Sequence, residues 1–104
     1  MPTIPAFTKT SLAQRLWLHA KENWPQLSRV DVRYHGQFAY VEGELADSAR
    51  LPLMRLRYSG SAHYWGLAIH TPSNGKYQPT PWFIGTPQEA LDLACDLYVT
   101  PLTD

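Results

Sequence analysis

Two segments of alternating polarity meet at a turn in Val30-Asp-Val-Arg-Tyr-His-Gly-Gln-Phe-Ala-Tyr-Val-Glu-Gly-Glu-Leu45. Residues 30–35 alternate apolar and polar side chains, which is typical of a half-buried β-strand. Gly36 tolerates a positive φ, so a tight turn over residues 35–37 is predicted to lead into a second strand over residues 38–45. The stretch therefore predicts an antiparallel hairpin as the centre of the fold.

Two further strands are predicted after this hairpin, over residues 51–58 and 63–71. Pro52 is near the start of the first of them, where a missing N–H donor does least harm. After Thr71 the chain is predicted to be a loop, because prolines and glycine interrupt it. Residues 82–84 are expected to form a short edge strand or to fill the core.

Helices are predicted on both sides of the strands. Residues 12–24 carry apolar side chains at helical spacing, with Thr10 or Ser11 as N-cap and Pro25 as the stop. The second helix begins with a capping box at Thr86-Pro-Gln-Glu89 and ends before Pro101. Two early prolines make residues 1–9 a predicted tail, which leaves residues 10–100 as a single domain.

This order predicts an α+β fold with an antiparallel four- to five-stranded meander sheet. The N-terminal and C-terminal helices are expected to pack on one face and to leave the other face open. By parity, Trp65, Leu67 and Ile69 belong to the core. The side chains assigned to the open face are Arg33, His35, Phe38, Tyr40, Glu42, Glu44, Leu51, Leu53, Arg55, Arg57, Tyr64, Gly66, Ala68 and His70.

The composition is that of a globular chain, with 44% hydrophobic and 17% charged residues among 104. The formal net charge is zero, but residues 1–57 hold eight Lys or Arg and five Asp or Glu, whereas residues 58–104 hold one and four. This asymmetry is compatible with one basic face or with two complementary elements that pack together. A single cysteine and no secretion or membrane segment favour a cytoplasmic protein.

The candidate ligand-binding set is the aromatic and cationic part of the open face. An arginine and tyrosine platform there is suited to a nucleic-acid base, a peptide or an anionic small molecule. The alternative is a solvated sheet on which Glu42 and Glu44 form cross-strand ion pairs with Arg55 and Arg57. The candidate residues are Arg33, Tyr40, Arg55, Arg57, Tyr64 and His70.

Motifs for catalysis and for cofactors are weak in this sequence. The four histidines show no metal-ligand spacing, so neither a metal nor another cofactor is predicted. Cys95 lies among apolar residues of the second helix, as an inert buried thiol does. Neither a Gly-x-Ser-x-Gly elbow nor a glycine-rich phosphate loop is present. No catalytic residue is assigned, although a small enzyme that uses His63 or His70 remains an alternative.

The order helix, strands, helix resembles that of the double-stranded RNA-binding domain. That family has a lysine-rich start of its second helix, whereas here the helix starts Thr86-Pro-Gln-Glu-Ala-Leu-Asp92, which is acidic. The chain also resembles a family of small uncharacterised actinobacterial proteins over most of residues 15–100. This resemblance implies a free-standing bacterial domain and no assigned activity. It is carried by residues 24–27, 32–41, 51–62, 65–69 and 85–91.

These observations together predict a non-enzymatic binding or interaction module that uses the aromatic and arginine sheet face. The expected partner is a protein, a peptide or an anionic ligand, and no membrane is expected. A nucleic-acid-binding accessory protein is the second hypothesis and a small enzyme the third.

Overall fold

The computed structural model describes residues 3–81 and 83–103, without the side chains of residues 102 and 103. Its five strands form one antiparallel sheet in the order β1-β2-β3-β4-β5. The elements in chain order are α1 (Ala6–Asn23), β1 (Leu27–His35), β2 (Phe38–Leu45), β3 (Arg50–Tyr58), β4 (Trp65–Thr71), β5 (Lys76–Pro79), α2 (Pro87–Tyr98) and α3 (Thr100–Thr103).

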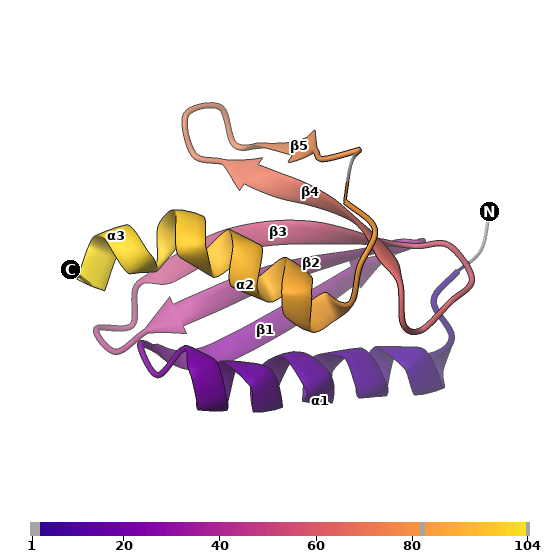
Figure 1. Cartoon of the computed structure of the whole chain (residues 1–104), viewed down its shortest axis with the longest axis horizontal. Helices are drawn as coiled ribbons and strands as arrows, with labels where there is room; N and C mark the ends of the chain where they lie inside the picture. Colours follow the sequence, from indigo (N-terminus) through magenta and orange to yellow (C-terminus); the bar gives the residue numbers. More distant parts are fainter. Residues whose placement is uncertain (1–2, 82, 104) are drawn as a thin grey trace.

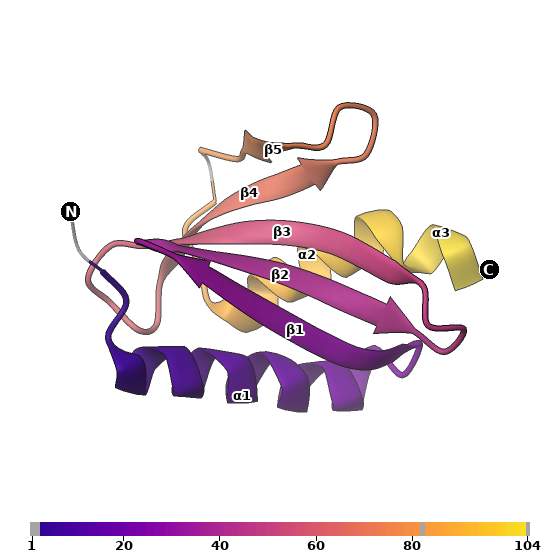
Figure 2. The ribbon, with the colours of Figure 1, turned by 180° about the vertical axis from the view of Figure 1, so that it is seen from behind.

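The helices and the sheet form two layers. Helix α2 lies across one face of the sheet, and α1 runs beside β1 and α2 (Figure 1). Seen from behind, the opposite face shows the strands in front, and no helix of the described part of the chain covers it (Figure 2). The predicted α+β meander with an open face is therefore confirmed. No helix in the described ranges is long and apolar enough to cross a membrane.

The core lies between the sheet and the helices. Trp65 is 1% exposed and its indole Nε1 donates to the backbone oxygen of Ala62 at 3.1 Å, which confirms its predicted burial. Tyr34 also points to the helix side, where its hydroxyl donates to the backbone oxygen of Lys9. The fully buried side chains of the two layers include Leu12, Leu16, Val41, Leu53, Met54, Leu56, Leu91 and Val99.

Helix α2 starts as predicted, whereas α1 starts earlier. Thr86 Oγ1 accepts from the backbone N–H of Glu89, and the Glu89 carboxylate accepts from the backbone N–H of Thr86. Helix α1 begins at Ala6 and not beyond Ser11, so residues 6–9 of the predicted tail are helical. Pro5 sits just before the first turn, where a missing N–H and a fixed φ do no harm. Residues 1 and 2 lie outside the described residues.

The fifth strand is not where the sequence placed it. Residues 76–79, predicted to be loop, pair with β4 as β5, with His70 opposite Tyr77. Gly75 adopts a φ of +68° in the connecting turn, and Pro79 is tolerated because β5 is an edge strand. Of the two alternatives for residues 82–84, Phe83 packs against the core and forms no strand, whereas Ile84 is exposed and does neither. Trp82 lies outside the described residues.

A bulge in β3 reverses the predicted orientation of Leu53. The pairing of β2 with β3 shifts between Val41 and Glu42, so that Val41 faces Met54 and Glu42 faces Pro52. The extra residue, Leu53, is fully buried and packs beside Gly43, where an added Cβ would lie 3.4 Å from the Leu53 Cδ1. A period-two pattern cannot anticipate this change, because a bulge inserts one unpaired residue into one strand.

Candidate ligand-binding surface

The open face divides into two clusters at the Leu53 bulge. The first, the ion-pair cluster, consists of Arg29, Asp31, Glu42, Glu44 and Arg50. Arg50 Nη2 lies 2.8 Å from Asp31 Oδ2 and 3.1 Å from Glu42 Oε2, and its Nη1 lies 3.6 Å from Glu44 Oε2. Arg29 Nε lies 2.8 Å from Asp31 Oδ1. The hydrogen bond from Arg50 holds the pKa of the Asp31 carboxyl below its usual value.

This arrangement corrects the predicted ion pairs. Glu42 and Glu44 were expected to face Arg55 and Arg57, but beyond the bulge Glu44 pairs with Arg50. One arginine thus contacts all three carboxylates of the cluster.

The second cluster, the arginine–aromatic cluster, occupies the other half of the open face. The strand register sets its layout, because Tyr40 lies between Arg33 and Arg55, and Arg57 pairs with Phe38. The next hairpin adds His70 opposite Tyr77. The cluster consists of Arg33, Phe38, Tyr40, Arg55, Arg57, His70 and Tyr77.

Guanidinium groups and rings contact one another within this cluster. The Arg55 Cζ is 4.5 Å from the Phe38 ring centroid and 5.8 Å from that of Tyr77. The Arg33 Cζ is 5.3 Å from the centroid of Tyr40, whose ring meets Tyr77 edge to face at 5.3 Å. Burial raises the pKa of the Tyr77 hydroxyl. The rings are therefore partly covered by cations and by one another.

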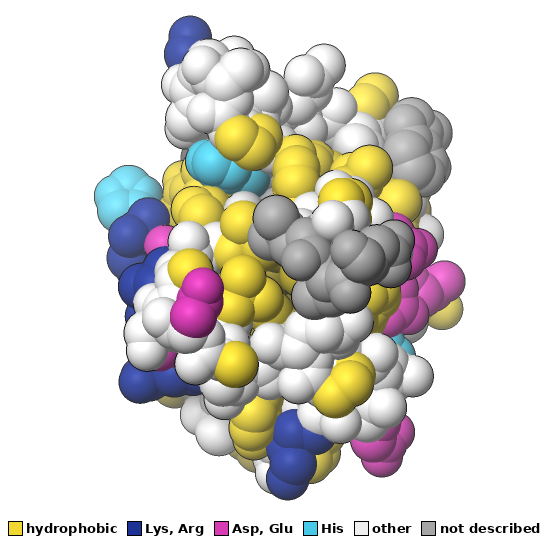
Figure 3. Space-filling view, turned by 90° about the vertical axis from the view of Figure 1, so that its left-hand side faces the viewer, with side chains coloured by type: hydrophobic (Ala, Val, Ile, Leu, Met, Phe, Trp, Pro, Cys, Tyr) yellow, Lys and Arg dark blue, Asp and Glu magenta, His cyan; other side chains and the backbone are white. Residues whose placement is uncertain are grey.

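The arginines of this cluster have no carboxylate partner among the described residues. Within residues 3–81 and 83–103, no Asp or Glu oxygen lies within 4.0 Å of Arg33, Arg55 or Arg57. The open face consequently carries more cations than carboxylates. Seen from the end at which α3 lies, most Lys and Arg gather along the left edge, which is the side of the open face, with a few Asp and Glu among them, whereas the right edge shows Asp and Glu (Figure 3). The charge asymmetry of the sequence thus becomes a basic face.

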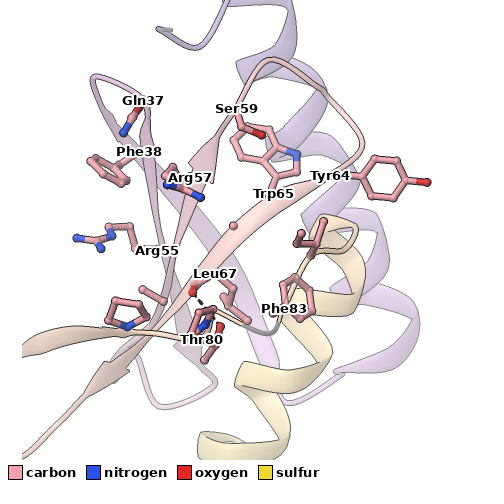
Figure 4. Close-up of a pocket in the computed structure, with 15 residues that line it drawn as sticks. Gln37, Phe38, Arg55, Arg57, Ser59, Tyr64, Trp65, Leu67, Thr80 and Phe83 are labelled. Carbon is pink, nitrogen blue, oxygen red and sulfur yellow. Dashed lines mark hydrogen bonds between the residues drawn. The ribbon is translucent and has the colours of Figure 1, made fainter. Parts of the chain in front are cut away.

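A groove runs beside the cluster along β4. It has a volume of about 470 Å³, and we call it the β4 groove (Figure 4). Gly66 and Ala68 form its floor, as the open-face parity of these small residues predicted. Its lining residues include Phe38, Arg55 and Arg57 from β2 and β3, Tyr64, Pro79 at the end of β5, and Thr80, Pro81, Phe83 and Ile84 after it.

Five of the six predicted candidates share this face. Arg33, Tyr40, Arg55 and His70 join the contacts described above, and Arg57 lines the groove beside Arg55. The sixth, Tyr64, precedes β4, is 56% exposed and points its ring away from Arg55 and Phe38 (Figure 4).

Sequence reasoning missed two members of the cluster. Phe38 was placed on the correct face but not chosen as a candidate. Tyr77 was assigned to a loop, so its face was not considered. A signal was present, because Thr71-Pro-Ser-Asn-Gly-Lys76 can be read as a hairpin turn, and His70 and Tyr77 flank it symmetrically.

The histidines do not form a catalytic arrangement with each other. His63 lies in the exposed loop before β4, and the strand from Trp65 to His70 by itself spans roughly 16 Å at about 3.3 Å per residue. The Nδ1 of His70 is buried without a hydrogen-bond partner in the described part of the chain. The backbone oxygen of His70 accepts a hydrogen bond from the Tyr98 hydroxyl, which ties α2 to β4.

A different histidine joins the two helices. His19 Nε2 and Trp24 Nε1 each lie 2.8 Å from Asp92 Oδ1, which links α1 to α2. Cys95 is fully buried nearby, and burial raises the pKa of its thiol to about 12. Such a thiol is not a nucleophile at neutral pH. In the described ranges, no three His, Cys, Asp or Glu side chains gather closely enough to hold a metal ion.

Comparisons of the chain with family models, with curated proteins and with solved structures find no match. The resemblance to small actinobacterial proteins therefore stays a prediction.

Proposed function

We propose that the protein is a non-enzymatic binding module whose arginine–aromatic cluster receives an anionic partner. The observation that carries this proposal is the division of the open face. Arg50 binds the three carboxylates of the ion-pair cluster, whereas Arg33, Arg55 and Arg57 contact rings or line the groove and have no carboxylate within 4.0 Å in the described chain. Guanidinium groups without a carboxylate partner keep their N–H donors available for a carboxylate or phosphate of a ligand.

The surroundings of His63 and His70 favour binding over catalysis. A general acid or base acts together with a nucleophile, a carboxylate or a second titrating group within hydrogen-bond reach. In the described chain the His63 imidazole makes no hydrogen bond or ion pair, and the His70 imidazole meets the Tyr77 ring with 5.3 Å between centroids. The buried thiol of Cys95 is in the core and far from solvent. A free cysteine is also compatible with the proposed cytoplasmic setting.

Single-stranded nucleic acid is a less suitable partner for this face. Bases bind to proteins by stacking on open aromatic faces. Here Arg33 lies over Tyr40 and Arg55 over Phe38, so cations already occupy ring faces that bases would need. The charge excess of the face is also local, because the whole chain has a formal net charge of zero.

The proposal is tested by titrating the protein with inorganic phosphate, 2-naphthoate and an oligothymidylate, with amide and arginine side-chain NMR signals as the readout. The triple variant Arg33→Gln, Arg55→Gln and Arg57→Gln is compared with Arg29→Gln, an exposed arginine of the ion-pair cluster. We expect at least one anion to shift signals of the arginine–aromatic cluster. Its binding should weaken with added salt, and the signal shifts should disappear in the triple variant only. Equal responses in both variants, or none to any anion, would contradict the proposal.

A further inference from the structure

The β4 groove exists because β4 carries two small residues, Gly66 and Ala68, on its open face. Gly66 pairs with Arg57, and Ala68 lies between Arg55 and Pro79 in the strand register. A Cβ at position 66 would lie 3.2 Å from the Arg57 Nε, so the Arg57 side chain covers the space that a larger residue would take. The Arg57 side chain thus lies over Gly66 and forms part of the floor beside Ala68.

The far wall forms where the chain leaves the sheet. Thr80 donates twice to the backbone oxygen of Leu67, from its N–H at 2.9 Å and from its Oγ1 at 2.8 Å. Strand β5 therefore ends at Pro79, and no β5 residue pairs with Gly66. The prolines at 79 and 81 give this wall a rigid, largely apolar surface opposite Phe38 and the arginines.

The groove has the size and the lining of a small-molecule site. Ligand pockets typically measure about 300–1,000 Å³ and are apolar with a few polar groups, and the β4 groove has about 470 Å³. Arg55 and Arg57 are two residues apart on one face of β3, so their Cα atoms are roughly 7 Å apart. Two such guanidinium groups suit one carboxylate or phosphate group, whose charge would offset theirs.

We propose that the β4 groove binds a small organic anion, with its carboxylate or phosphate group at Arg57 and Arg55 and a flat apolar body over Ala68, against the wall of Pro79 and Pro81. This inference rests on the proposed function and names the ligand class for it. A polymeric anion would instead extend over the whole cluster, including Arg33 on β1, which does not line the groove. The role of Arg33 therefore separates a small ligand from a nucleic acid.

The test measures the dissociation constants of 2-naphthoate, 1-naphthyl phosphate, inorganic phosphate and 2-naphthol by NMR titration. With the wild-type protein, the naphthyl anions are expected to shift the amide signals of Gly66 and Ala68 and the Nε signals of Arg55 and Arg57. They should bind more tightly than inorganic phosphate or 2-naphthol, which each lack one half of the ligand. The double variant Arg55→Gln and Arg57→Gln should weaken binding about tenfold or more, as expected for charge-assisted hydrogen bonds, while Arg33→Gln leaves it unchanged.

A second variant blocks the floor without changing charge. Gly66→Val displaces the Arg57 side chain from its place over Gly66 into the space of the ligand body, and it should weaken binding of the naphthyl anions about as much as the double variant does. Thermal unfolding checks that this variant folds, and the wild-type signal shifts locate the site independently of it. Naphthyl anions that bind no better than phosphate, or equally well after loss of Arg55 and Arg57, would overturn the inference. An oligothymidylate that binds more tightly and depends on Arg33 as much as on Arg57 would also overturn it, yet would leave the proposed binding function intact.

Discussion

The ion-pair cluster and the arginine–aromatic cluster share one sheet face and are both built around arginines on β3. They differ in the residue that lies opposite each arginine on the neighbouring strand β2. Arg50 pairs with Glu44 and reaches Asp31 and Glu42, whereas Arg55 pairs with Tyr40 and Arg57 with Phe38. The first arginine is neutralised by its neighbours and the other two are not. Arginine content alone therefore does not mark a binding surface; the cross-strand partner decides it.

Stability does not explain why the two clusters differ. Exposed ion pairs contribute about 0.2–1 kcal/mol each, and exposed cation–π contacts contribute about 0.5–1 kcal/mol. Both clusters therefore stabilise the fold by similar, small amounts. What distinguishes them is the charge that stays available to a ligand, which binding experiments measure and unfolding experiments do not.

The largest expected effect concerns the core under the β4 groove. Trp65→Ala should lower the free energy of unfolding by about 3–5 kcal/mol, because loss of a fully buried indole leaves a cavity and removes a hydrogen bond to the Ala62 oxygen. Urea denaturation of the variant and of Trp65→Phe measures this, and the phenylalanine variant should lose less. An unchanged denaturation midpoint would show that β4 presents the opposite face to the helices.

Leu53→Ala tests the bulge that separates the two clusters. Because Leu53 is fully buried, its truncation should lower the free energy of unfolding by about 2–5 kcal/mol. The matched control is Leu51→Ala, since Leu51 is only partly buried on the same strand. If the free energy of unfolding falls by the same small amount in both variants, Leu53 faces solvent in solution and no bulge separates the two clusters.

A smaller change is expected when Arg55 and Arg57 are both replaced by glutamine. Neither residue has an ion pair in the described chain, so only ring contacts are lost, and the free energy of unfolding should fall by less than about 2 kcal/mol. Chemical denaturation measures this in parallel with the ligand titrations. A fall in the free energy of unfolding as large as that of Leu53→Ala would mean that these arginines stabilise the sheet and do not serve mainly to bind a ligand.

The smallest effect is a difference in acid stability within the ion-pair cluster. The folded-state pKa of Asp31 lies below its unfolded value of about 3.9. The contribution of Asp31 to the free energy of unfolding is therefore fully present above that pH, and it is lost as the pH falls through the lowered folded pKa. In Arg50→Gln the stability lost on acidification should be smaller, because the hydrogen bond from Arg50 is the main cause of the lowered Asp31 pKa.

Thermal unfolding of the wild type and of Arg50→Gln at a series of acidic pH values measures that difference. Glu89 also has a lowered pKa, through its hydrogen bond from the Thr86 backbone, and its contribution is common to both proteins. Arg57→Gln serves as the control, since Arg57 touches no carboxylate of the cluster in the described residues. Identical pH profiles for the wild type and Arg50→Gln would show that Arg50 does not hold Asp31 in solution.

Local patterns in the sequence determined most of the fold. Alternation over residues 30–45 indicates the central hairpin, and the parity of Trp65, Leu67 and Ile69 indicates the buried side of β4. The capping box at Thr86 indicates the start of α2. These features depend on residues within a few positions of one another, so the chain itself carries the information. The open-face positions of Arg33, Tyr40, Arg55, Arg57 and His70 follow from the same alternation.

Only the tertiary structure decided how that face is divided. The bulge buries Leu53 beside Gly43, and beyond it Glu44 pairs with Arg50. Tyr77 contacts Tyr40 and His70 only because residues 76–79 pair with β4 as β5. The prolines around this segment made the sequence predict a loop there. Both outcomes depend on residues brought together from different strands. Strand register is set by such contacts across the sheet, and one residue of shift exchanges every cross-strand partner beyond it.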